Sequence, residues 1–136
     1  DLFSGSGMVG IEAFSRGASP VMLVERDKGK RKTIVQNIAG LEAGISVRIE
    51  PVERFVARNK TQFDLVYLDP PFNYPHKQDL LMRVGRSRSI APGGIVLIHA
   101  PGEEQFPQQL AGLAQTTVRR YGRSVVTVFG FSPAES

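Results

Sequence analysis

The chain has 136 residues, of which 41% are hydrophobic and 22% charged, and its formal net charge is +4. This size and composition fit one globular domain, and no apolar run approaches the roughly 20 residues of a membrane span. The absence of cysteine excludes a disulfide framework, thiol catalysis and cysteine-ligated zinc, and it fits a reducing compartment. We therefore expect a soluble, cytoplasmic protein, and the positive charge favours a polyanionic partner.

The chain opens on a glycine-rich segment of a kind that normally follows a strand. Gly5, Gly7 and Gly10 have the G-x-G-x-x-G spacing, in which glycines let the backbone approach a ligand closely. A helix over residues 11–16, stopped by Gly17, is expected to follow. The pattern alone is equally compatible with a tight strand-to-helix turn that holds no ligand. Because the chain starts at Asp1 without a methionine, we expect an upstream segment and most of a first strand to precede it.

A second apolar run, residues 21–25, ends on an acid. Glu25 at the end of such a strand can accept both hydroxyls of a ribose, although it is also compatible with a plain surface glutamate. The glycine loop and Glu25 together favour a nucleoside-containing cofactor.

The remaining pattern predicts an alternation of helices and strands. We expect helices over residues 28–41, 52–58, 77–90 and 108–114, and strands over residues 45–49, 63–68, 95–99, 116–120 and 124–131. Pro92-Gly93-Gly94 reads as a turn, and a short glycine-containing loop joins the last two strands into a hairpin. This order indicates a single α/β domain over residues 1–136. We expect a mostly parallel sheet, covered by helices on both faces, with a C-terminal antiparallel hairpin.

The apolar strand over residues 63–68 runs into Asp69-Pro70-Pro71-Phe72. We expect this strand to be buried on both faces, with Asp69 at its carboxyl end, where α/β sheets bind ligands. The two prolines make a stiff turn and lack N–H groups. A carboxylate, the Pro70 carbonyl and an aromatic ring form a receptor for a flat ring that carries an amine. The alternative is a rigid loop whose aspartate caps a helix. Neither histidine, His76 or His99, is assigned a role.

Several of these segments resemble the RsmD family, bacterial 16S ribosomal RNA (guanine-N2)-methyltransferases. The resemblance covers essentially the whole chain and is strongest in the glycine loop and the D-P-P-F turn. The segments that carry it are Asp1-Leu2-Phe3-Ser4-Gly5-Ser6-Gly7, Ser15-Arg16-Gly17-Ala18, Val24-Glu25-Arg26-Asp27, Asn37 and Leu68-Asp69-Pro70-Pro71-Phe72. It implies a Rossmann-like class I methyltransferase that uses S-adenosyl-L-methionine. It also implies an additional N-terminal segment in family members.

The resemblance also implies roles for individual residues. Asp1, Gly5 and Gly7 would contact the methionine part of the cofactor, Glu25 would bind the ribose, and Arg26 would lie beside the adenine. Where the family commonly has an Asp-Ala pair that reads the adenine edge, this chain has Pro51-Val52, so the backbone of Val52 is the remaining candidate. The implied catalytic residues are Asp69, Pro70 and Phe72, and the implied substrate-binding residues are Pro71, Phe72 and Asn73.

These expectations define one leading function and two alternatives. The leading function is methylation of the exocyclic N2 amine of a guanine in 16S ribosomal RNA, free or in an assembling small ribosomal subunit, by a monomer without a metal or a membrane partner. An adenine-N6 DNA methyltransferase is the second reading, because the same turn serves an adenine amine. The third is a nucleotide-binding module without catalysis, which the glycine loop and Glu25 permit.

Overall fold

The computed structural model describes residues 1–133 and confirms an α/β protein. The chain divides into two compact units, Asp1–Phe55 and Val56–Ser136. The single domain expected over residues 1–136 stays a prediction. Within residues 1–133, no helix combines the length and the apolar character needed to cross a membrane.

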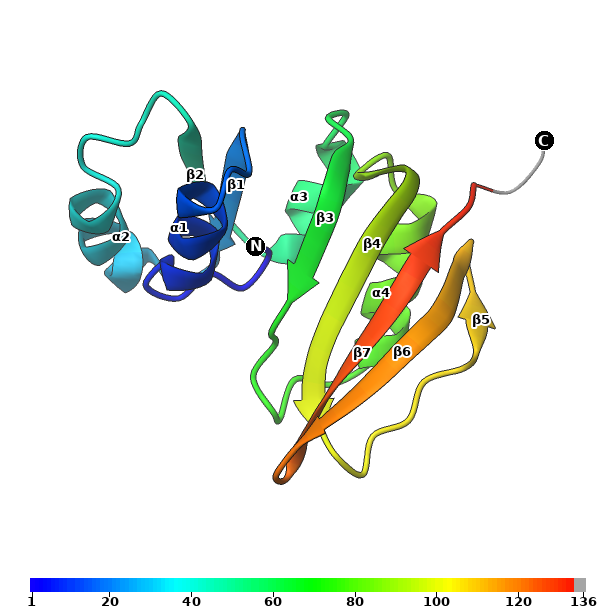
Figure 1. The fold of residues 1–136 in the computed structure, drawn as a ribbon. Coiled ribbons are helices and arrows are strands. Elements are labelled where there is room, and N and C mark those ends of the chain that lie inside the picture. The colour runs from blue at the N-terminus through cyan, green and yellow to red at the C-terminus, as the bar shows by residue number, and fades with distance from the viewer. Residues whose placement is uncertain (134–136) are drawn as a thin grey trace. The chain divides into compact units, whose positions relative to one another are not determined.

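The first unit is a parallel strand pair with helices from the same segment of chain (Figure 1). Its elements are α1 (Met8–Ser15), β1 (Val21–Glu25), the 3-10 helix η1 (Lys28–Lys30), α2 (Arg31–Asn37), β2 (Ile45–Ile49) and α3 (Val52–Arg58), the last of which continues into the second unit. β1 and β2 pair in parallel with Val21 opposite Ile45. Leu23, Ile34 and Ile45 are fully buried and form the core of this unit.

The expected helix over residues 28–41 is shorter in the structure. It begins as η1, whose first turn is capped by the Asp27 carboxylate, and α2 ends at Asn37. Ile38 leaves the helical conformation and Gly40 adopts a φ of 87°, which favours glycine and turns the chain toward β2. Ile34 and Ile38 are buried as the periodicity predicts, whereas Val35 is 47% exposed.

The second unit is a five-stranded mixed sheet with the order β3-β4-β7-β6-β5 (Figure 1). Its elements are β3 (Phe63–Leu68), α4 (Lys77–Arg86), β4 (Ile90–Pro101), β5 (Gln109–Leu110), β6 (Leu113–Tyr121) and β7 (Ser124–Phe131). β3 and β4 are parallel, and the other pairs are antiparallel. The C-terminal hairpin is confirmed as β6 and β7. The mostly parallel sheet is confirmed only for β1 with β2 and β3 with β4.

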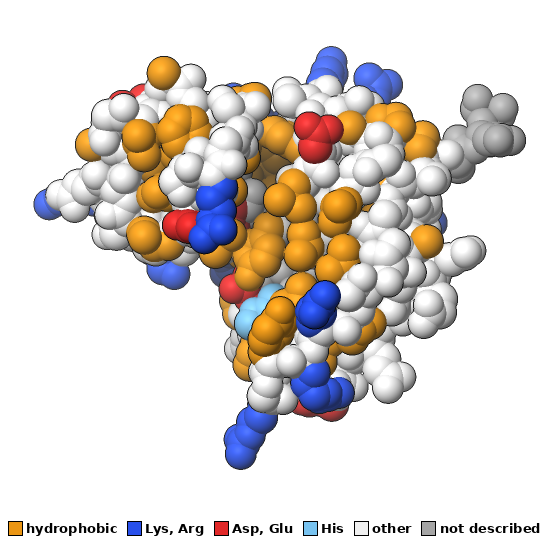
Figure 2. All heavy atoms as spheres, in the orientation of Figure 1, with side chains coloured by type: hydrophobic (Ala, Val, Ile, Leu, Met, Phe, Trp, Pro, Cys, Tyr) orange, Lys and Arg blue, Asp and Glu red, His pale blue; other side chains and the backbone are white. Residues whose placement is uncertain are grey.

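The two faces of this sheet differ in burial. Val96, Ile98 and Phe129 share one face of the sheet and are fully buried. In Figure 1, α4 lies behind this sheet. On the opposite face Leu65 is 52% and Ile95 is 43% exposed, and hydrophobic side chains gather there in Figure 2. The expectation that the strand over residues 63–68 is buried on both faces is therefore wrong, because only its Val66 and Leu68 side is covered.

Other boundaries also differ from the sequence-based expectations, and α1 and β6 both begin three residues earlier than expected. α4 ends at Arg86, so the helix expected to reach residue 90 stops earlier. β4 includes the expected turn at residues 92–94, because Ile90 pairs with Phe63 and Ile95 with Leu65 around an irregularity. The helix expected over residues 108–114 is wrong: Ala111 and Gly112 have φ values of 51° and 81° and form the turn between β5 and β6.

Candidate functional site

The glycine loop lies beside the carboxyl end of β1. Its first residues run along that strand, since the Val24 N–H donates to the Asp1 carbonyl and the Ser4 N–H donates to the Val24 carbonyl, each over 2.9 Å. Gly5 and Gly7 have φ values of 57° and 88°, and Gly7 is the N-cap of α1. These two positions require glycine for their backbone conformation, so the loop can place bare backbone near a ligand.

Gly10 allows α1 to pack against β1 and is not needed for the backbone to approach a ligand. It lies inside α1 with an ordinary φ, and a Cβ atom at this position would overlap the Leu23 side chain. Gly10 therefore sets how closely α1 approaches β1. The third glycine of the pattern shapes the unit, whereas the first two shape the loop.

Glu25 fastens the loop to the end of β1. It is only 8% exposed, its Oε1 accepts the Gly5 N–H over 2.9 Å, and its Oε2 accepts the Asp27 N–H over 2.8 Å. A carboxylate offers about four lone-pair sites, so each oxygen can accept one further hydrogen bond. Binding of ribose hydroxyls by Glu25 stays a prediction that this geometry allows.

Asp1 carries the least satisfied polar group in the described part of the chain. Within residues 1–133, both of its carboxylate oxygens are buried and have no hydrogen-bond partner. A buried, unpaired carboxylate is costly, so this position favours a cationic partner, which the side chains of residues 2–133 do not provide. The ammonium of an amino-acid ligand has the required charge. Asp1, Gly5 and Gly7 thus fit the amino-acid end of such a ligand.

The other predicted cofactor residues differ in exposure. Arg26 follows β1 and is exposed, whereas the Val52 side chain is buried, which leaves its backbone as the group that could meet a ligand. The Asn37 side-chain amide donates to the Ser6 carbonyl over 2.8 Å and so braces the glycine loop from the end of α2. The roles of Arg26 and Val52 stay predictions.

The second group of predicted residues gathers at the carboxyl ends of β3 and β4. Leu68 lies opposite Ile98, so the next residues, Asp69 and His99, are neighbours across parallel strands about 4.8 Å apart. His99 Nδ1 lies 3.1 Å from Asp69 Oδ1. With its proton on Nδ1, the imidazole donates a hydrogen bond to the carboxylate.

The Asp69 carboxylate has a second partner, Tyr67, on the strand β3 that precedes it. The Tyr67 hydroxyl donates a hydrogen bond to the Asp69 carboxylate, and burial together with this negative neighbour raises the pKa of Tyr67 above its ordinary value of 10. Tyr67 lies on β3 and Asp69 directly follows that strand, so these side chains, two residues apart, point to the same side. Two donors thus orient one carboxylate whose side chain is still 41% exposed and open to a ligand.

The D-P-P-F turn then presents its aromatic ring beside this carboxylate. Phe72 is 56% exposed, and its ring meets the His99 ring edge-on at a centroid distance of 5.9 Å. Pro70 is buried, whereas Pro71 and Asn73 are exposed. The structure therefore brings Asp69 and Phe72 together around His99.

His99 is the residue that sequence reasoning missed. A signal was present: the strands predicted over residues 63–68 and 95–99 are expected to be parallel, so their carboxyl ends, and with them Asp69 and His99, lie near the same edge of the sheet. A histidine at a strand end has many ordinary roles, so the residue type alone could not show this.

Residues 1–130 match the model of a protein family described as "Conserved hypothetical protein 95". The chain belongs to this family. Among its relatives, "Putative rRNA methyltransferase YlbH" of Bacillus subtilis (strain 168) is 28% identical over 134 residues, which are 95% of this chain and 73% of that protein. "Ribosomal RNA small subunit methyltransferase D" of Escherichia coli (strain K12) is 28% identical over 108 residues, 79% of this chain and 54% of that protein. The resemblance to RsmD-type methyltransferases is thereby confirmed.

A solved structure from Streptococcus pyogenes, titled a conserved hypothetical protein, has a TM-score of 0.89 and 30% sequence identity to this chain. The similarity covers 97% of this chain and 84% of that one. The matched region thus spans about half of the Escherichia coli protein and a larger share of the other two.

Proposed function

We propose that this family member is an S-adenosyl-L-methionine-dependent methyltransferase with a Rossmann-like class I fold, and that it methylates the exocyclic N2 amine of a guanine in 16S ribosomal RNA. The observation that carries the proposal is the Asp69 carboxylate, which Tyr67 and His99 hold beside the exposed Phe72 ring. The names of the relatives, both rRNA methyltransferases, support the reaction and the RNA substrate. Such a substrate places the protein in the cytoplasm.

The exocyclic amine of guanine is a weak nucleophile because its lone pair is delocalised into the ring. The Asp69 carboxylate and the Pro70 carbonyl can each accept a hydrogen bond from one N–H group of this amine. These bonds turn the nitrogen toward tetrahedral geometry and withdraw its lone pair from the ring. The protein then acts by positioning and electrostatics, and Asp69 is placed to take the proton that the nitrogen loses. Phe72 stacks on the base, an interaction of roughly 1–3 kcal/mol in comparable platforms, once the base has left its own stack.

The residues of the first unit fit the methyl donor. Asp1 offers an unpaired buried carboxylate for the cofactor's ammonium, Gly5 and Gly7 offer bare backbone, and Glu25 has remaining acceptor capacity for a ribose. S-adenosylmethionine supplies an activated methyl group when bound. Arg26 and the Val52 backbone are proposed to flank the adenine. No metal is required by this chemistry.

Transfer of a labelled methyl group tests the proposal. With labelled S-adenosylmethionine, we expect the wild-type protein to label small-subunit rRNA or an assembling subunit, and Asp69→Ala to abolish labelling while its circular dichroism stays unchanged. Full activity of Asp69→Ala would contradict the proposed role of the Asp69 carboxylate. Labelling of DNA and not RNA would favour an adenine-N6 methyltransferase. Cofactor binding without transfer to either nucleic acid would favour a binding module.

A further inference from the structure

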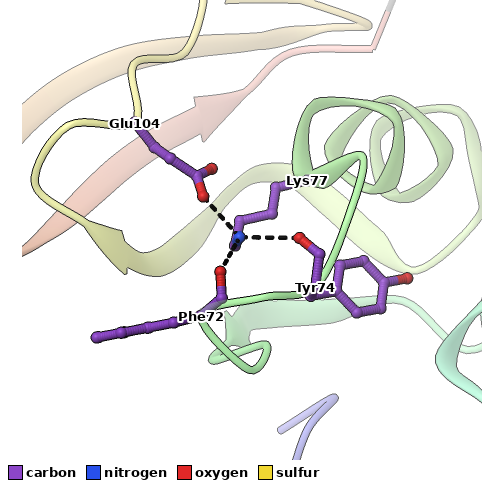
Figure 3. Close-up of polar contacts among 4 residues, drawn as sticks. All are labelled: Phe72, Tyr74, Lys77 and Glu104. Atoms are coloured by element: carbon purple, nitrogen blue, oxygen red, sulfur yellow. Dashed lines mark hydrogen bonds and ion pairs between the residues drawn. The ribbon is translucent and has the colours of Figure 1, made fainter.

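Lys77 is a buried lysine whose ammonium contacts the end of the D-P-P-F turn and the loop that follows it (Figure 3). Its Nζ donates to the Phe72 carbonyl and to the Tyr74 carbonyl, each over 2.9 Å, and to Glu104 Oε1 over 2.6 Å. An ammonium has three N–H donors, so these partners use all of them. Only 3% of the Lys77 side chain is exposed, against 32% of the Glu104 side chain.

The position of Lys77 is not explained by the helix that it begins. Lys77 is the first residue of α4, and the N-terminal end of a helix carries a partial positive charge that disfavours a cation. Burial of a charged amine is also unfavourable unless the charge is paired and hydrogen-bonded. The charge is therefore held there by its three acceptors. Two of these are backbone carbonyls of the loop that follows Asp69-Pro70-Pro71.

We propose that Lys77 and Glu104 act as a clamp that positions the D-P-P-F turn for methyl transfer. The ammonium gathers the carbonyls of Phe72 and Tyr74 around one point, and Glu104, which follows β4, anchors that point to the strand that carries His99. Inside the same loop the Tyr74 N–H donates to the Pro71 carbonyl over 2.8 Å. Lys77 touches no reacting group, so it is a positioning residue for Phe72 and, through the turn, for the Pro70 carbonyl and Asp69.

The clamp makes a prediction that does not depend on the identity of the substrate. In the protein without ligands, Lys77→Met should speed hydrogen exchange in the loop over residues 72–76, and Glu104→Gln should do so more weakly because its amide oxygen still accepts a hydrogen bond. The matched control is Arg83→Met. Arg83 lies on the same helix and pairs with Asp79 over 2.9 Å, but both side chains are more than half exposed, so exchange in the loop should not change.

The kinetic prediction rests on the proposed function. A displacement of about 1 Å in a positioned group can cost roughly 100-fold in rate, so we expect Lys77→Met to lower kcat by about 10- to 100-fold. The Kd for S-adenosylmethionine should stay unchanged, because its proposed residues lie in the other unit. Lys77→Arg, which keeps the charge, should recover part of kcat.

The two readouts, loop exchange and kcat, allow the clamp and the proposed function to be tested separately. Faster loop exchange in Lys77→Met and Glu104→Gln, together with lower kcat and unchanged cofactor Kd, supports the clamp. Wild-type loop exchange and kcat in both variants overturn it. If Lys77→Met fails to fold, Glu104→Ala, at a side chain that is partly exposed, decides the question by the same two readouts. If the wild-type protein transfers no methyl group, the proposed function fails, and loop exchange alone decides the clamp.

Discussion

Replacing His99 by alanine tests whether the carboxylate of Asp69 must be held in place. The substitution removes the 3.1 Å contact of Nδ1 with Asp69 and the edge-on contact with the Phe72 ring. A hydrogen bond to a charged group contributes about 1.5–3 kcal/mol and an aromatic pair about 0.5–1.5 kcal/mol. Because the side chains of His99 and Asp69 are 26% and 41% exposed, solvent screening brings the sum to its low end of about 2 kcal/mol or below it. A total loss of about 1–2 kcal/mol corresponds to a roughly 5- to 30-fold lower kcat.

The assay is single-turnover methyl transfer to small-subunit rRNA at saturating S-adenosylmethionine. His99→Asn should recover most of the rate lost in His99→Ala, because an asparagine amide can donate a hydrogen bond from about the position of Nδ1. The control is His76→Asn at the other histidine, which is exposed and has a φ of 60° that asparagine tolerates. A wild-type rate in His99→Ala would refute the argument that His99 orients Asp69.

Three other predictions concern packing, stacking and pH. Gly10→Ala forces a methyl group against Leu23. The overpacking, which costs roughly 1–3 kcal/mol, should outweigh the gain of about 1 kcal/mol in helix propensity. Calorimetry should show a lower Tm, and an unchanged or higher Tm would contradict the packing role of Gly10. Phe72→Ala, at an exposed ring, should raise the KM for RNA without changing the Kd for S-adenosylmethionine; an unchanged KM would remove Phe72 from the substrate site. The raised pKa of Tyr67 means that its stabilising effect is complete below pH 10 and is lost as the pH rises through the folded-state pKa. Above pH 10, the free energy of unfolding measured in urea should therefore fall less in Tyr67→Phe than in the wild type. Parallel plots of this free energy against pH would contradict the prediction.

The strands and short helices that the sequence predicted well are those with strong local signals. The expected bounds of β1, β2, β3, β7 and α3 match the structure, because each is an apolar or periodic run bounded by glycine, proline or polar residues. The helix expected over residues 108–114 is absent because this segment forms a hairpin, in which β5 and β6 pair around Ala111 and Gly112. β6 also pairs with β7, so strand pairing outweighed local helix propensity there.

The candidate site also has one part that could be predicted from local sequence and another that could not. The glycine loop and the D-P-P-F turn could be predicted because glycine permits backbone conformations that other residues avoid, whereas proline restricts φ and lacks an N–H. The contacts of Asp69 with His99 and of Lys77 with Glu104 join residues about 30 positions apart in the sequence. They follow from strand register and loop closure, which no short sequence pattern encodes.

The most direct test of the central claim is nucleoside mass spectrometry of rRNA after reaction with the protein and S-adenosylmethionine. The proposed function predicts N2-methylguanosine at one position of 16S rRNA with the wild-type protein, and none with Asp69→Ala. Methylation at any other atom, or equal N2-methylguanosine with Asp69→Ala, would contradict the claim that Asp69 presents a guanine amine for methyl transfer.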